Sequence, residues 1–282
     1  MKIRKKVKLN LLVISMLIMA SMLSACGETT ETTPAASGNE TNVAEETAIE
    51  EPAVSEVKIE LKSGDSIKEA LEQLPPLEGE ETGLIFLTNG LYEYQTGAIP
   101  TGWTLEGESV DGVIITPEME QHFTNQGSIK NITFQNISGM SNGGAIYNDG
   151  GLVENCKIKN GYADADGGGI YNMKGSVINC TFESLQGGYF GEWGTEHPSI
   201  EGSCGGGVYN NEGLVDGCTF IDCFVEGAGG GVFNLKGTVS NSTFTGCASR
   251  NDYNGGGVYN VEGTVTGCTF ENCTPDGQFD QI

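Results

Sequence analysis

One sixteen-residue pattern occurs five times in this chain, and this repetition limits the folds available to it. The copies span residues 143–158, 167–182, 205–220, 229–244 and 255–270, and the last reads GGGVYNVEGTVTGCTF. Successive copies are offset by 24, 38, 24 and 26 residues, so one step contains an insertion. A short and nearly constant period predicts a solenoid whose repeats bury a core only by stacking on one another.

Each repeat has the composition of short strands joined by tight bends. Val, Thr, Tyr and Phe favour strands, and glycines separate them. One position accepts only Asn or Gly, the types that adopt a left-handed backbone, so we predict a bend there. After the bend a Cys position and an Ile or Phe position are two residues apart, so both should face inward. The bend position is held by Asn131, Asn155, Asn179, Gly217, Asn241 and Gly267.

These repeats resemble the right-handed parallel β-helix of the pectin-lyase-like proteins over about residues 57–274. The segments IFLTNGLY from Ile85, WTLEG from Trp103 and GVII from Gly112 look like the opening rungs of that family. The tetrapeptide GGAI at 143–146 also looks like half of the repeat of polymorphic outer-membrane adhesins, whose partner motif Phe-x-x-Asn is absent from the last four repeats. The resemblance implies an all-β fold, a right-handed parallel β-helix solenoid over residues 57–282.

Residues 66–74, SIKEALEQL, have the pattern of a short helix. Ser66 and Glu69 have the spacing of a capping box, and two prolines stop the helix after residue 74. Its apolar residues share one face: Ile67, Ala70, Leu71 and Leu74. We predict that this N-terminal capping helix covers the open end of the solenoid core.

The first 56 residues are predicted to target and tether the chain. Residues 1–25 join a basic start to an apolar run of about a dozen residues, which is short for a membrane span. The sequence LSAC that ends at Cys26 resembles the lipobox of bacterial lipoproteins, which implies cleavage before Cys26 and lipidation of its side chain. The alternative is an ordinary secretory signal with a chance cysteine. Residues 26–56 hold eight glutamates and no Lys, Arg or aromatic residue, so we expect a disordered acidic tether.

The acidic charge of the chain argues against some partners. The whole sequence has 14 basic and 38 acidic residues, and removal of residues 1–25 takes five of the basic ones, which leaves a net charge of −29. Nucleic-acid phosphates require Lys and Arg, so we expect no nucleic-acid partner. We expect a bacterial cell-envelope protein that faces outside the cytoplasm and reaches the membrane through the lipid on Cys26.

Apart from Cys26, seven of the eight cysteines fall into two repeat columns. We favour buried free thiols stacked in the core over disulfides, although neighbouring rungs are close enough for a bridge. No CxxC pair occurs, and we expect no metal and no cofactor. The two columns are Cys156, Cys180, Cys218 and Cys268, and Cys223, Cys247 and Cys273.

An aromatic column is the first candidate binding surface. If the residues on either side face inward, the rings face outward, where they either shield the backbone or offer flat faces to sugar rings. The column consists of Tyr147, Tyr171, Tyr209, Phe233 and Tyr259. The position after it is always asparagine, which predicts a structural ladder of side-chain hydrogen bonds: Asn148, Asn172, Asn210, Asn234 and Asn260.

The insertion from Gln186 to Ser203 is the second candidate binding surface. Insertions in solenoids form loops on one face, often the binding face. The alternative is that its rings fold back over the wall as a small satellite core. The insertion concentrates Tyr189, Phe190, Trp193 and His197.

Enzymes of the pectin-lyase-like fold cleave polysaccharides, and the sequence bears on that activity. Lyases of acidic sugars in that family use acidic calcium-binding clusters and a basic proton acceptor, but Arg250 is the only Arg after residue 25, and neither Asp-Asp nor Asn-Thr-Asp occurs. His122 and His197 are isolated in sequence. An acid/base pair assembled across rungs stays open.

We therefore predict a surface-anchored, non-catalytic binding or adhesion module for a glycan or another host-surface ligand, with no catalytic residues assigned. A polysaccharide lyase or glycoside hydrolase is the alternative, and a passive surface spacer is the third reading. The fold alone does not decide among them.

The anchor prediction is tested by Cys26→Ser. This variant lacks the side chain that accepts the lipid, so no lipid anchors the chain in the bilayer. The protein should therefore be released from the membrane or stay unprocessed. Detergent-phase partitioning and the size of the processed chain measure this. A variant that partitions and matures like its parent contradicts the lipobox prediction.

Overall fold

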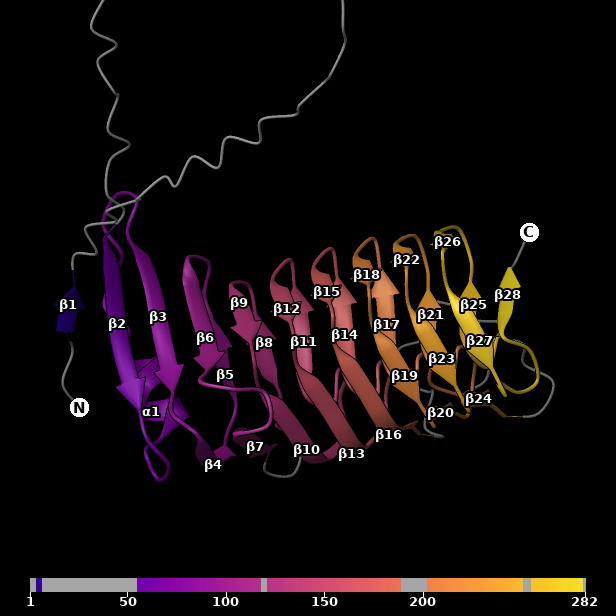
Figure 1. The fold of residues 1–282 in the computed structure, drawn as a ribbon, viewed down its shortest axis with the longest axis horizontal. Helices are drawn as coiled ribbons and strands as arrows, with labels where there is room; N and C mark the ends of the chain where they lie inside the picture. Colours follow the sequence, from indigo (N-terminus) through magenta and orange to yellow (C-terminus); the bar gives the residue numbers. More distant parts are fainter. Residues whose placement is uncertain (1–3, 7–54, 118–120, 189–201, 251–254, 281–282) are drawn as a thin grey trace, which may run out of the picture.

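The chain forms a parallel β-solenoid of about nine turns (Figure 1). The structure is a computed structural model and describes residues 4–6, 55–117, 121–188, 202–250 and 255–280. Each complete turn passes through three sheets in the same order, so strands from successive turns are neighbours. All the strand pairs are parallel except the one between β1 and β2.

The first sheet contains, in spatial order, β1 (Arg4–Lys6), β2 (Glu56–Leu61), β3 (Thr82–Leu87), β6 (Trp103–Gly107), β9 (Ser128–Lys130), β12 (Leu152–Glu154), β15 (Ser176–Ile178), β18 (Leu214–Asp216), β22 (Thr238–Ser240) and β26 (Thr264–Thr266). The second sheet contains β4 (Gly90–Tyr94), β7 (Val113–Pro117), β10 (Thr133–Gly139), β13 (Lys157–Ala163), β16 (Thr181–Gly187), β19 (Thr219–Ile221), β23 (Thr243–Thr245) and β27 (Thr269–Glu271). In the same sheet β20 (Phe224–Val225) pairs with β16, and β24 (Ala248–Ser249) pairs with β20. The third sheet contains β5 (Gly97–Ile99), β8 (Phe123–Asn125), β11 (Ile146–Asp149), β14 (Ile170–Met173), β17 (Val208–Asn211), β21 (Val232–Asn234), β25 (Val258–Asn260) and β28 (Gln278–Asp280).

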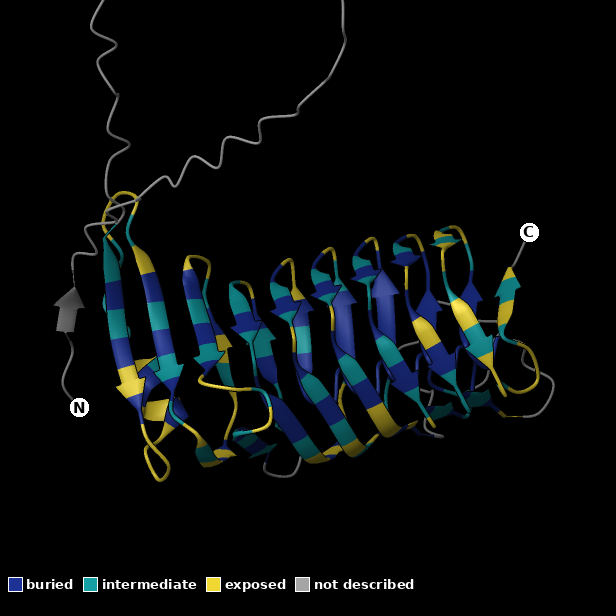
Figure 2. Cartoon of the chain, in the orientation of Figure 1, coloured by how far each residue is buried: buried dark blue, intermediate teal, exposed yellow. Residues whose placement is uncertain are grey.

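Equivalent residues of successive repeats pair in register, as the repeats predict. In the second sheet Phe182 pairs with Phe220, and their rings stack at 4.6 Å between centroids. In four successive strands of the first sheet, β12, β15, β18 and β22, the middle residue is a valine that points inward. These valines are fully buried: Val153, Val177, Val215 and Val239. Figure 2 shows this alternation of buried and more exposed residues along the strands. The core is therefore a set of stacked columns that run the length of the solenoid.

The predicted bends have the left-handed backbone that the Asn and Gly column requires. The φ angles of this column lie between 49° and 65°. A second left-handed column in the second sheet, which includes Asn136, Asn160 and Ser184, was not predicted. The bends turn the chain between sheets, so they set the cross-section of the solenoid.

The buried cysteines line the core as free thiols, in agreement with the interpretation that we favoured. Cys180 is 1% exposed, and its thiol donates to the carbonyl of Val153 in the turn before. Burial raises the pKa of the Cys218 thiol. Cys204, which fits no column, is also buried.

The capping helix α1 (Ile67–Glu72) forms within the predicted segment and is shorter than it. The Ser66 side chain accepts a hydrogen bond from the Glu69 N–H at 3.1 Å. Ile67 and Ala70 are buried in the core, and α1 packs against β4 and β5. The helix thus closes the end of the second and third sheets, as predicted.

At the opposite end, the short tail after the last repeat predicts that Phe279 and Ile282 plug the core. Residues 278–280 instead form β28, which pairs with β25, and the Phe279 ring stacks on Tyr259 at 4.9 Å. Phe279 therefore extends the aromatic column outside the main core. Ile282 lies outside the described residues.

The asparagine column forms the predicted ladder. In each described rung, Asn Nδ2 donates to the Oδ1 of the next asparagine at 2.7–2.8 Å, and also to a backbone carbonyl three residues ahead in the repeats. The ladder begins one turn earlier than predicted, at Asn125, and ends on the carboxylate of Asp280. Asn148, Asn172, Asn210 and Asn234 are completely buried, so the ladder satisfies amides that would otherwise be unpaired.

The residue before a glycine of each repeat alternates between lysine and glutamate in four successive turns, which also fits in-register stacking. Lys174 lies 3.6 Å from Glu212, and Lys236 lies 3.9 Å from Glu262. All four side chains are about half exposed or more, so each pair contributes little to stability.

The ladder predicts a specific stability cost for Asn172→Ala. This change removes one acceptor and two donors, so in a buried site one N–H of the Asn148 amide and the Oδ1 of Asn210 lose their partners, while the other N–H of Asn148 keeps its bond to the Gly151 carbonyl. The free energy of unfolding should fall by about 3 kcal/mol. Urea denaturation measures it. The matched control, Lys236→Ala, breaks an exposed ion pair and should cost less than about 1 kcal/mol. Equal costs for the two variants contradict the proposed role of the ladder.

Candidate functional site

The outer face of the third sheet has a continuous column of stacked rings. The centroid separations are 5.3 Å for Tyr147–Tyr171, 4.7 Å for Tyr171–Tyr209, 5.2 Å for Tyr209–Phe233 and 5.5 Å for Phe233–Tyr259. In-register pairing of β11, β14, β17, β21 and β25 places the rings at this spacing. The predicted stacking is confirmed.

Over most of this column the rings are buried, which agrees with the shielding alternative. Tyr209 is 1% exposed and Phe233 is 0% exposed, and the rings form a second apolar cluster with Cys204, Ala228 and Leu235. The alternation of side chains along a strand gives the direction of each ring but not what covers it. Of the five rings, Tyr147 is the one with intermediate exposure. The column therefore shields the third sheet over most of its length and opens at Tyr147.

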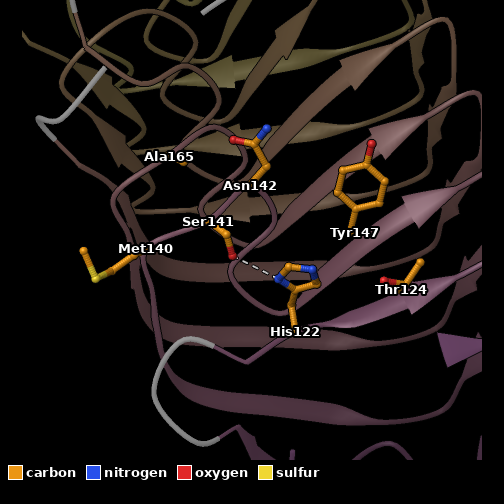
Figure 3. A pocket seen from close by; sticks show the side chains of 7 residues that line it. All are labelled: His122, Thr124, Met140, Ser141, Asn142, Tyr147 and Ala165. Carbon is orange, nitrogen blue, oxygen red and sulfur yellow. Dashed lines mark hydrogen bonds between the residues drawn. The ribbon is translucent and has the colours of Figure 1, made fainter. Parts of the chain in front are cut away.

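A cavity of about 590 Å³ lies at this open end of the column (Figure 3). It is lined by His122, Thr124, Met140, Ser141, Asn142, Tyr147 and Ala165. These residues come from the strands β8 and β11 and from the loops before β8, between β10 and β11 and between β13 and β14. We call it the His122–Tyr147 pocket.

His122 and Tyr147 form one side of the pocket. Their ring centroids are 6.3 Å apart with a tilt of 30°, and His122 precedes β8, the strand that pairs with β11. The His122 Nδ1 lies 3.0 Å from the Ser141 hydroxyl. Among the described residues the other ring nitrogen, Nε2, has no hydrogen-bond partner, so it is available to a ligand.

The loop between β10 and β11 supplies the polar groups opposite. Gly143 has a φ of 73°, and a Cβ there would lie 2.3 Å from the carbonyl oxygen of Ile146, so only glycine permits this turn. The turn fixes Asn142, whose Oδ1 accepts from the Asp166 N–H at 3.2 Å. The amide nitrogen of Asn142 is then the donor that this side chain offers to the pocket.

The pocket holds an uncharged imidazole at neutral pH. Burial lowers the pKa of His122 from its ordinary value of 6.5, because a partly desolvated imidazole resists protonation. With Nδ1 engaged by Ser141, the ring can donate or accept one hydrogen bond at Nε2. Chemically, the pocket combines two ring faces with hydroxyl and amide groups, a combination that suits a sugar.

The sequence predicted part of this site. Tyr147 is a predicted binding residue, whereas His122 is isolated in the sequence, and its partner Ser141 comes from the next turn. Thr124, Met140, Ser141, Asn142 and Ala165 were missed; the one signal for them was a polar loop directly before a glycine pair. The insertion residues Tyr189, Phe190, Trp193 and His197, and the lipidation site Cys26, lie outside the described residues.

No group of three or more His, Cys, Asp or Glu side chains in the part of the chain that the structure describes could hold a metal ion. No helix in the described ranges is both long enough and apolar enough to cross a bilayer.

Comparison with known families agrees with the fold. Residues 113–279, more than half of the chain, match the family model described as Right handed beta helix region. The chain belongs to this family, and its solenoid is a right-handed parallel β-helix. No curated protein matches the sequence.

The titration of His122 provides a test of the pocket. Its folded pKa should lie below 6.5, whereas an unfolded histidine titrates near 6.5. As the pH falls below 6.5 the unfolded state takes up the proton first, so this residue should lower the stability at acid pH and not at pH 7. NMR measures the pKa from the imidazole resonance that disappears in His122→Gln. A midpoint above 6.5 contradicts the buried, neutral imidazole.

Proposed function

We propose that this protein is a non-catalytic glycan-binding module, tethered to the bacterial cell envelope through a lipid on Cys26. The observation that supports binding is the His122–Tyr147 pocket, where an aromatic column that is buried elsewhere becomes accessible. Aromatic faces pack against the apolar faces of sugar rings, and nearby hydroxyl and amide groups hydrogen-bond to the sugar hydroxyls.

The pocket has the dimensions and the chemistry of a small-molecule site. Its volume of about 590 Å³ falls within the range of ligand sites, which run from about 300 to 1,000 Å³. Tyr147 and His122 supply the flat walls, and Ser141 and Asn142 supply the hydrogen-bonding groups. A glycan of a few residues on a cell surface matches this combination.

The proposed location follows from the N-terminal sequence. A lipid on Cys26 and the acidic tether of residues 26–56 would hold the β-helix away from the membrane, where it meets polysaccharides or the surface of a host cell. The insertion, with Tyr189, Phe190, Trp193 and His197, remains a second proposed contact surface.

A polysaccharide lyase or glycoside hydrolase is the second candidate. The observation that favours it is His122, a neutral imidazole in the pocket that has the protonation state of a general base. The two candidates differ in whether bound polysaccharide is cleaved, so one set of assays separates them.

Tyr147→Ala tests the proposed function. Loss of the accessible ring should weaken glycan binding at least tenfold, about 1.4 kcal/mol, while the melting temperature changes little, because Tyr147 is at the exposed end of the column. A glycan array identifies ligands, and calorimetry on the best ligand gives the affinity.

The matched control is Phe86→Ala, which removes a partly exposed ring from the first sheet, under Lys58. This variant should bind like the parent. Failure of the parent to bind any glycan, or equal binding by Tyr147→Ala, overturns the proposal. Release of unsaturated or reducing ends from polysaccharide would favour the enzyme.

A further inference from the structure

The lining of the His122–Tyr147 pocket lacks the positive charge that a site for an acidic sugar would need. None of its seven lining residues in the described part of the chain is Lys, Arg, Asp or Glu. Burial lowers the pKa of His122, the lining residue that ordinarily titrates near neutral pH, so its imidazole is neutral at pH 7. The pocket therefore offers hydrogen bonds and ring faces but no fixed positive charge.

Acidic residues flank one lining residue, Ala165, and another follows Tyr147 by two positions. Ala165 lies between Asp164 and Asp166 in the chain, and Asp166 is 2% exposed. One oxygen of Asp166 accepts the backbone N–H of Cys204 at 2.7 Å. Asp149, at the end of β11, accepts a hydrogen bond from Gln126. A carboxylate placed in the pocket would meet these charges with no cation in the lining.

Several cations of the described chain are paired with carboxylates elsewhere. The pairs are Lys130–Glu154, Lys157–Asp111, Lys174–Glu212, Lys236–Glu262 and Arg250–Glu226. The whole chain has a net charge of −24. The long-range field of the protein therefore also repels anions.

From these observations we infer that the His122–Tyr147 pocket selects neutral sugars and excludes uronate-containing and sulfated glycans. This inference rests on the proposed glycan-binding function. An anionic sugar would lose its hydration without gaining a counter-ion, which is costly in a partly desolvated site. A neutral sugar exchanges its water for the hydroxyl of Ser141, the amide of Asn142 and His122 Nε2.

The exposed rim of the pocket supports the same ligand class. Met140 is 65% exposed and lines the entrance, where its thioether side chain can pack against the apolar edge of a sugar. Thr124, on β8, adds a hydroxyl beside Tyr147, since these two residues pair across β8 and β11. Neither residue offers a charge to an acid group.

Matched oligosaccharides that differ only at C6 give the test. Calorimetry at pH 7 compares gluco- with glucurono-oligosaccharides and galacto- with galacturono-oligosaccharides, using the full processed protein. The neutral member of at least one pair should bind at least tenfold more tightly than its uronate.

Two charge variants locate the selectivity. Met140→Lys, at the exposed rim, and Thr124→Lys, on the pocket wall, should each raise uronate affinity at least fivefold and change neutral-sugar affinity less. Thr219→Lys adds the same charge to the outer face of the second sheet, away from the pocket, and should leave both affinities within twofold of the parent.

The outcomes separate this inference from the proposed function. Uronates that bind as tightly as their neutral partners, or more tightly, overturn the neutral-sugar inference and leave glycan binding intact. Binding to no sugar in the panel overturns both. The inference is also overturned if Thr219→Lys reduces the preference for neutral sugars and Met140→Lys and Thr124→Lys do not. Selection then comes from the overall charge and not from the pocket.

Discussion

In-register stacking of identical positions is the constraint on which this structure depends. Each turn pairs its strands with the same strands of the next turn, so one residue type can satisfy a whole column. The buried asparagine ladder shows how strict this is, because each amide donates to the next amide at 2.7–2.8 Å. A one-residue slip in any turn would leave buried amides unpaired and would turn core residues toward solvent.

The same constraint explains where a site can form. Where the turns repeat regularly, the outward rings are covered by neighbouring segments of the chain, as the buried rings of Tyr209 and Phe233 show. A pocket needs a turn that departs from the pattern. The turn that contains His122 precedes the first complete repeat, and the loop before Tyr147 carries Met140, Ser141 and Asn142 at the positions that Asp164, Ala165 and Asp166 hold in the next turn. The pocket thus forms where the irregular first turns meet the regular repeats.

Prediction from the sequence succeeded where one residue type recurs in a column. The left-handed bends, the asparagine ladder, the stacked rings and the N-cap at Ser66 follow from local preference and period, and all are present. It left two alternatives open where exposure depends on a neighbouring segment: the ring of Tyr209 points away from the main core and is covered by the cluster that contains Cys204 and Leu235. It also missed β28, because Phe279 joins the column through pairing and not through the glycine motif.

The sequence by itself determined the repeat, the parallel β-helix class and the identity of the core columns, because the period and the residue types are local properties of the chain. Only the tertiary structure decided which outward residues are accessible and which distant residues meet. His122 and Ser141 are 19 positions apart, and their contact depends on the bends and loop lengths of two successive turns. The sixteen-residue pattern begins at Gly143, after both residues, so the pocket became visible only when the turns were stacked.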